Sequence, residues 1–137
     1  MRGLYVDTGV WLALLDAADP FHPKAKAIVE AHKAYPFVSS DHVLSETVTL
    51  LRRELGPEPA TGFGREFLEG KIGQLVQVEK PDWLEGFKII EKYKDQKVSA
   101  ADATSVAIIR RMDLERVASF DKHFRVIITE REVVGGV

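Results

Sequence analysis

GLYVDTGVWLALL, residues 3–15, contains two kinds of hydrophobic pattern separated by one charged residue. Residues 3–6 form a short apolar run typical of a strand. After Asp7 the apolar residues recur every three or four positions, and Thr8 is expected to cap a helix over residues 9–16. A strand that leads directly into a helix indicates an α/β organisation.

The rest of the chain repeats this alternation. Further strands are expected at residues 37–38, 75–78, 117–120 and 126–128, and further helices at 23–34, 41–55, a shorter segment ending near 71, 82–93 and 100–112. Strands separated by helices imply a parallel sheet covered by helices on both faces. The predicted fold is one domain over residues 1–137, a three-layer α/β/α sandwich with a central parallel sheet of about five strands and an irregular tail from 129 to 137.

The composition limits the possible functions. The chain carries 45% hydrophobic residues and a formal charge of −2, so it can bury a core but has no overall basic field that would attract nucleic acid. It has no cysteine, which excludes disulfides, iron–sulfur clusters, thiolate zinc sites and a cysteine nucleophile. The uninterrupted apolar run 10–15 is too short for a signal peptide core, and no segment reaches transmembrane length. We expect a soluble intracellular domain.

Four acidic residues lie where strands are expected to end or helices to begin: Asp7, Glu46, Asp102 and Asp121. Asp7 and Asp121 are expected one residue past the first and fourth strands, at the carboxyl edge of the sheet, where ligands bind in folds of this class. Asp102 lies near the start of the last long helix, and Glu46 lies beside the apolar stripe of an earlier one. The three aspartates are therefore expected to meet at one edge.

Each acid alone has a structural explanation. Asp7 and Asp121 can cap helices, Ser99 with Asp102 has the pattern of a capping box, and Glu46 can be a solvated charge. Together they favour a metal site, because clustered carboxylates repel one another and a charge in apolar sequence is rare unless it is paired or bound to a metal. Oxygen donors select Mg²⁺, with Mn²⁺ as a substitute, and such a site can activate water against a phosphodiester.

Four short motifs surround these acids. They are Asp7-Thr8 with Trp11 and Leu12, Ser39-Ser40 with the helical Glu46, Asp102-Ala103 in an Ala-rich helix, and Ser119-x-Asp121 with Phe124. In this order and at these separations, over residues 4–128, the chain resembles the PIN-domain proteins, especially the VapC-like toxin ribonucleases of toxin–antitoxin pairs.

The resemblance implies a Mg²⁺- or Mn²⁺-dependent endoribonuclease that hydrolyses single-stranded RNA. It implies that Asp7, Asp102 and Asp121 bind the metal and that Glu46 binds it directly or through a water molecule. Thr8 and Ser119 would support the site or contact phosphate. It also implies a homodimer, an antitoxin that plugs the acidic site, a cytoplasmic location and no membrane association.

Basic and histidine side chains near the acids are further candidates. Lys122 and Arg125 flank Asp121 and are the better phosphate contacts among the basic residues. The four histidines are expected on the surface or in loops, and His123, two residues from Asp121, is a weak candidate for substrate contact.

Three other interpretations compete with this one. Asp7-Thr8-Gly9 is the tripeptide of aspartic proteases, but those proteins continue into a strand and this chain continues into a helix. A phosphoacceptor receiver domain needs an acidic neighbour beside Asp7, which is missing. The alternative that stays open is a non-catalytic PIN scaffold that binds RNA or a protein partner.

Overall fold

The computed structural model describes residues 2–135, and this part of the chain forms five strands and seven helices. The strands are β1 (Leu4–Val6), β2 (Phe37–Ser40), β3 (Gln74–Val76), β4 (Arg116–Ala118) and β5 (Glu132–Val134). The helices are α1 (Thr8–Leu15), α2 (His22–Ala31), α3 (Asp41–Leu55), α4 (Pro57–Leu68), α5 (Lys80–Lys92), α6 (Ala100–Arg111) and α7 (Lys122–Ile127). The domain predicted over 1–137 also includes residues 1, 136 and 137, which lie outside the described part. Within the described part, none of the helices has the length and hydrophobicity to span a bilayer.

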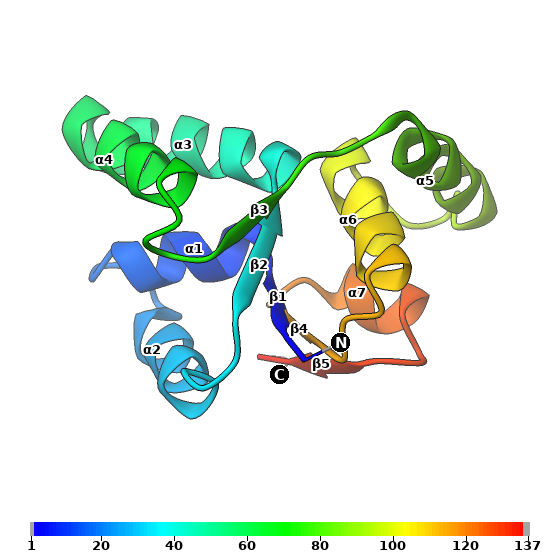
Figure 1. The fold of residues 1–137 in the computed structure, drawn as a ribbon, viewed down its shortest axis with the longest axis horizontal. Coiled ribbons are helices and arrows are strands. Elements are labelled where there is room, and N and C mark those ends of the chain that lie inside the picture. Colours follow the sequence, from blue (N-terminus) through cyan, green and yellow to red (C-terminus); the bar gives the residue numbers. More distant parts are fainter. Residues whose placement is uncertain (1, 136–137) are drawn as a thin grey trace.

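The five strands form one parallel sheet in the order β3-β2-β1-β4-β5. The chain starts at the centre, where Tyr5 of β1 lies opposite Val38 of β2 on one side and Val117 of β4 on the other. Helices α1 to α4 cover one side of the sheet and α5 to α7 cover the other (Figure 1). The predicted three-layer α/β/α sandwich is confirmed, and the order of strands reverses between β1 and β4, which is where such sheets open a crevice for a ligand.

The core lies on both faces of the sheet. Every residue of β1 is buried, because the helical layers cover both of its sides. On one side Trp11 of α1 packs against the rings of Phe63 and Phe67 of α4, with centroids 5.5 and 5.6 Å away. On the other side α6 is buried at each position from 103 to 109. Its small and β-branched residues allow it to lie between the sheet and α5.

The prediction of a fifth strand at residues 126–128 is wrong. Residues 122–127 form α7, and β5 lies at Glu132–Val134, inside the tail that was expected to be irregular. The side chains show why the apolar run is helical: Phe124 and Ile127, three apart, are buried, whereas Val126 is 43% exposed. Asp121 also starts the helix by accepting a hydrogen bond from the backbone N–H of His123.

The four histidines, expected on the surface or in loops, are partly exposed, and they lie in helices or, for His32, directly after one. The first three histidines each have a hydrogen-bond partner for their ring Nδ1. The partners are Ala13 O for His22 at 2.7 Å, Ile28 O for His32 at 2.8 Å and Thr104 Oγ1 for His42 at 3.0 Å. The contact of His42 with Thr104 joins the start of α3 to α6 across the site edge of the sheet. These three rings are therefore partly exposed, and each has a polar partner in the protein.

Candidate active site

The carboxyl edge of the sheet opens into a cleft of about 450 Å³ near the ends of β1 and β4. Its lining includes all four acids predicted from the sequence, together with residues that were not singled out. The lining residues are Asp7, Thr8, Gly9, Leu12, Glu46, Leu50, Ser99, Asp102, Phe120 and Asp121. The expectation that the three aspartates meet at one edge of the sheet is therefore confirmed, and Glu46 lies with them in the same cleft.

Asp7 is the most buried of the four acids, with 7% of its surface exposed. It directly follows β1, and its backbone N–H donates to Ala118 O at 3.0 Å, which fixes it beside the end of β4. The hydroxyl of Ser119 donates to Asp7 Oδ2 at 3.0 Å. Ser119 was predicted to support the site, and this contact is consistent with that role.

The environment of Asp7 disfavours its charge. Its pKa is raised to about 7, chiefly by burial and also by the nearby carboxylates of Asp102 and Glu46. Hydrogen bonds from the Thr8 backbone and the Ser119 hydroxyl act in the opposite direction but do not outweigh burial. When Asp7 is ionised, it is repelled by the neighbouring carboxylates, and a cation bound between them would reduce this repulsion.

Thr8 does not cap α1, contrary to the sequence prediction. Asp7 occupies the N-cap position, without a side-chain cap hydrogen bond, and Thr8 is the first residue of the helix. Thr8 Oγ1 is buried and has no hydrogen-bond partner within residues 2–135. A buried hydroxyl without a partner is uncommon and is available to a ligand in the cleft that Thr8 lines.

Asp102 both belongs to a capping box and lies in the cleft. Ser99 Oγ accepts from the Asp102 backbone N–H at 3.0 Å, and Asp102 Oδ2 accepts from the Ser99 backbone N–H at 3.4 Å, so the capping box exists. The same carboxyl group lines the cleft. Burial raises its pKa, and Asp121 and Glu46 raise it further despite the hydrogen bonds from Ser99.

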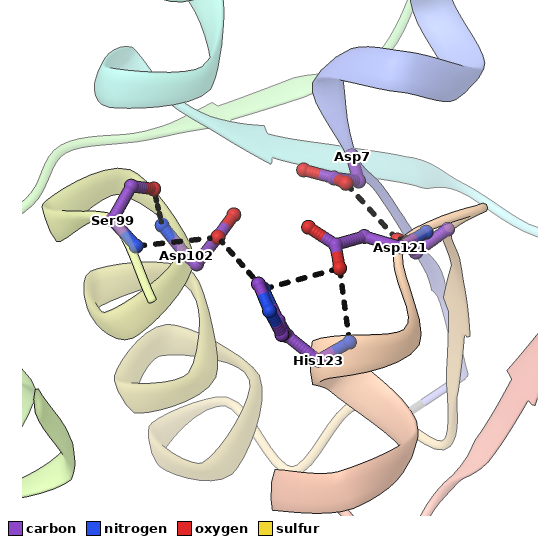
Figure 2. Close-up of polar contacts among 6 residues, drawn as sticks. Asp7, Ser99, Asp102, Asp121 and His123 are labelled. Atoms are coloured by element: carbon purple, nitrogen blue, oxygen red, sulfur yellow. Dashed lines mark hydrogen bonds and ion pairs between the residues drawn. The ribbon is translucent and has the colours of Figure 1, made fainter. Parts of the chain in front are cut away.

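Asp121 lies three residues beyond the end of β4 and not one residue beyond it as predicted. The intervening turn is held by Ser119, whose Oγ accepts from the Asp121 backbone N–H at 3.0 Å. Asp121 caps α7 through its Oδ1, which accepts from the His123 backbone N–H at 2.9 Å. The longer turn brings the Asp121 side chain over the cleft, facing Asp102 and Asp7 (Figure 2).

Glu46 reaches the cleft from α3, on the opposite side of the sheet from α6. Its carboxylate acts on the pKa of both Asp7 and Asp102, which places its charge near both groups. Lys122 and Arg125 are exposed on α7 and lie outside the lining of the cleft, and Arg125 lines a separate hollow near the start of β5. The phosphate contacts predicted for these two residues stay a prediction.

The donors of the cleft suit a hard divalent cation. Ligand atoms of Asp102, Asp121 and His123 lie within 4.8 Å of one another, and Asp7 faces them across the same space (Figure 2). Carboxylate oxygens are the ligands that Mg²⁺ and Mn²⁺ prefer. His123 was predicted from its position two residues after Asp121 only as a candidate for substrate contact, and its closeness to Asp102 was not predicted.

Comparisons with known proteins match almost the whole chain. A family model described as PIN domain matches residues 4–128. The 23S rRNA-specific endonuclease VapC20 of Mycobacterium tuberculosis is 32% identical over 124 residues, which cover 88% of this chain and 91% of the relative. Ribonuclease VapC26 of the same organism is 28% identical over 134 residues, which cover 97% and 96%.

Solved structures also match almost the whole chain. The crystal structure of Mycobacterium tuberculosis VapC20, described as a Sarcin-Ricin loop cleaving toxin, has a TM-score of 0.82 at 28% identity and covers 90% of this chain and 93% of that chain. A toxin–antitoxin complex from Klebsiella pneumoniae has a TM-score of 0.69 at 16% identity and covers 96% of both chains, which shows the shared fold. Since the family model spans residues 4–128 and a relative 32% identical covers most of the chain, this protein belongs to the PIN domain family.

Proposed function

We propose that the chain is a Mg²⁺- or Mn²⁺-dependent endoribonuclease that hydrolyses single-stranded RNA, and that it is the toxin of a toxin–antitoxin pair. The observation that carries the proposal is the convergence of Asp7, Glu46, Asp102 and Asp121 on one cleft at the carboxyl edge of the sheet. Membership of the PIN family and the ribonuclease names of VapC20 and VapC26 support the same reaction.

The metal would be held by the carboxylates of Asp7, Asp102 and Asp121, with Glu46 as a direct or water-mediated ligand. When bound, such a cation polarises the phosphodiester and makes a water molecule nucleophilic near neutral pH. The raised pKa values of Asp7 and Asp102 support this assignment, because two carboxyl groups that repel their neighbours are stabilised as anions by a cation between them.

The chain itself supplies binding and orientation. Ser119 holds Asp7 by donating to its Oδ2, and it holds the turn that carries Asp121 by accepting from that residue's backbone N–H. The unpartnered hydroxyl of Thr8 can donate to a phosphate oxygen in the cleft. Lys122, next to Asp121 in the chain, and Arg125 are exposed on α7 and can bind phosphates of the RNA outside the cleft.

The acids also explain why RNA would need the metal in order to bind productively. Four carboxylates facing one cleft repel the phosphate backbone, and the net charge of −2 gives no compensating field. Removal of the cation should therefore weaken substrate binding as well as the chemical step.

The proposal extends to the partners and location of the protein. The K. pneumoniae neighbour is described as a toxin–antitoxin complex, and its fold matches this chain along almost its full length. We infer a homodimer that works in the cytoplasm and is silenced by an antitoxin seated in the acidic cleft. Because VapC20 is named for 23S rRNA, ribosomal RNA is the first substrate to test.

The test is cleavage of a labelled RNA by the wild type and by Asp7→Asn, side by side. We expect cleavage with Mg²⁺ or Mn²⁺, none with EDTA, and products that carry a 5′-phosphate and a 3′-hydroxyl, because water attacks phosphorus without help from the 2′-hydroxyl. Asp7→Asn should lose cleavage while it stays folded, and Glu46→Gln should lose less if Glu46 acts through water.

A matched control is Glu66→Gln, since Glu66 is exposed on α4, outside the cleft. It should cleave like the wild type. A 2′,3′-cyclic phosphate product would refute attack by water. Equal activity of wild type and Asp7→Asn would indicate a contaminating nuclease and would favour the non-catalytic scaffold.

A further inference from the structure

His123 lies between two of the acids in the cleft. Its side chain is 15% exposed, and its ring Nδ1 lies 3.1 Å from Asp121 Oδ1 and 3.9 Å from Asp102 Oδ2. The backbone N–H of His123 donates to the same Asp121 Oδ1 at 2.9 Å. One residue therefore approaches Asp121 twice and reaches Asp102 from the side opposite Asp7 (Figure 2).

The oxygens near His123 are the outer ones of the two carboxylates. Asp121 Oδ1 already accepts the His123 backbone N–H, and Asp102 Oδ2 already accepts the Ser99 backbone N–H. The other oxygen of each carboxylate points into the space that both share with Asp7 (Figure 2). Each aspartate thus has one oxygen engaged by the protein and one turned toward the centre of the cleft.

The surroundings of Nδ1 determine which role it can have. This atom is buried, and no group within residues 2–135 forms a well-oriented hydrogen bond with it. Its nearest polar neighbours are carboxylate oxygens, which only accept hydrogen bonds when ionised. A nitrogen lone pair facing them would add to the repulsion in the cleft, whereas an Nδ1–H placed there would attract both.

We propose that His123 is a positioning residue for the metal site: its Nδ1–H lies between the outer oxygens of Asp102 and Asp121 and keeps their inner oxygens directed at one shared cation. The role rests on the proposed function, because it has value only if the aspartates bind a metal. Donors behind metal-binding carboxylates commonly set the orientation of those ligands and their affinity for the ion.

The alternative role for this nitrogen is direct ligation. Ligand atoms of His123, Asp102 and Asp121 lie within 4.8 Å of one another, and the oxygens nearest to Nδ1 are Asp121 Oδ1 and Asp102 Oδ2. A cation beside Nδ1 would therefore be bound by one nitrogen and these two oxygens. That arrangement would use the outer oxygens, which already accept backbone hydrogen bonds. It would also leave the inner oxygens, which face Asp7, without a role, and for this reason we favour the positioning role.

The experiment measures Mn²⁺ affinity by titration calorimetry for the wild type, His123→Ala and His123→Asn. The amide nitrogen of Asn can take the place of Nδ1 and donate to the same oxygens, whereas Ala cannot. We expect His123→Ala to bind Mn²⁺ about 10- to 100-fold more weakly and His123→Asn to recover most of the loss. The matched control is His32→Ala, at the end of α2, which should bind like the wild type.

Two further measurements separate the possible outcomes. Circular dichroism in metal-free buffer verifies that each variant is folded, and pulsed EPR of bound Mn²⁺ should show no directly coordinated nitrogen in the wild type. A coordinated nitrogen, or full affinity in both His123 variants, would overturn the positioning role and leave the proposed function intact. If wild type bound no Mn²⁺ at all, the metal site of the proposed function would itself fail.

Discussion

Ser119 and Asp7 lie 112 positions apart in the chain, and the Ser119 hydroxyl donates a 3.0 Å hydrogen bond to Asp7 Oδ2 in the floor of the cleft. The same hydroxyl oxygen accepts from the backbone N–H of Asp121. Ser119 is fully buried, so solvent cannot replace either bond. One side chain at the end of β4 therefore fixes the acid that follows β1 and the turn that carries the acid before α7.

Ser119→Ala should destabilise the protein by about 2 kcal/mol, because it leaves a buried carboxyl group without its donor and a backbone N–H without its acceptor. Urea denaturation measures the change in the free energy of unfolding. Ser45→Ala, on the exposed side of α3, removes a hydroxyl of the same size and should cost less than about 0.5 kcal/mol. Equal costs for the two variants would contradict the linking role of Ser119.

The metal-free protein should lose stability as the pH rises through the range where Asp7 ionises. Its pKa is raised from 3.8 to about 7 in the folded state, so the folded protein keeps a proton that the unfolded chain releases. The contribution of this group to the free energy of unfolding is full below pH 3.8 and is lost as the pH rises to about 7. The raised pKa of Asp102 acts in the same direction.

Urea denaturation in EDTA at pH 5 and pH 8 measures this effect. Relative to Asp7→Asn, which cannot ionise, the wild type should lose roughly 2 to 3 kcal/mol between these two values. Parallel pH profiles of the two proteins would show that Asp7 has an ordinary pKa in the fold.

The sequence predicts best those elements whose ends have local signals. Helix α3 has the predicted bounds, because Ser40 caps its start and Gly56, with φ of 99°, ends it before Pro57. Strand β5 has only three residues and pairs with β4 alone, so its position depends on tertiary contacts. The apolar run 126–128 was mistaken for it, because a short apolar run fits a strand and a helix equally well.

The sequence predicts that the acids meet, because parallel strands end at one edge of a sheet. The proposed role of His123 cannot be predicted from the sequence, since it depends on the turn between β4 and α7. That turn, held by Ser119, extends Asp121 three residues beyond the strand and directs the ring of His123 toward α6. Contacts of this kind are made by loop geometry and leave no periodic pattern in the sequence.

Removal of Arg111 should destabilise the join between α5 and α6. Its guanidinium donates to Asp82 Oδ1 and Oδ2, both at 2.9 Å, and the Asp82 side chain is 3% exposed. Burial raises the pKa of Asp82, but hydrogen bonds from Arg111 and from the Glu79 backbone outweigh it and lower the pKa. The carboxylate is therefore charged in the fold and depends on its partner.

Arg111→Met should cost about 2 kcal/mol, less than for a fully buried pair because the Arg111 side chain is 41% exposed. Adding Asp82→Asn to that variant should recover part of the loss, since the unpaired buried charge is removed. Thermal unfolding of both variants, with Arg65→Met on the exposed surface of α4 as control, measures these differences. No recovery in the double variant would show that Asp82 is neutral or solvated.

The capping box at α6 predicts opposite effects for its two members in metal-free protein. Ser99→Ala removes an N-cap and should cost about 1 kcal/mol. Asp102→Asn keeps a side-chain acceptor and relieves repulsion with Asp121, so it should be neutral or slightly stabilising. A loss above about 2 kcal/mol for Asp102→Asn would mean that this carboxylate serves the helix more than the cleft. Urea denaturation in EDTA compares the two.

Mn²⁺ should stabilise the wild type and not a variant that lacks two of the proposed ligands. A ligand at a hundredfold excess over its Kd adds about 2.7 kcal/mol to the free energy of unfolding, which raises the Tm by several degrees for a domain of this size. Asp7→Asn/Asp102→Asn keeps the shape of both side chains but removes two charges from the cleft, so its Tm should be the same with and without Mn²⁺. Glu66→Gln, which loses a charge outside the cleft, should keep the full response. If the double variant responded to Mn²⁺ as the wild type does, the ion would be bound elsewhere on the protein and the cleft would not be its site.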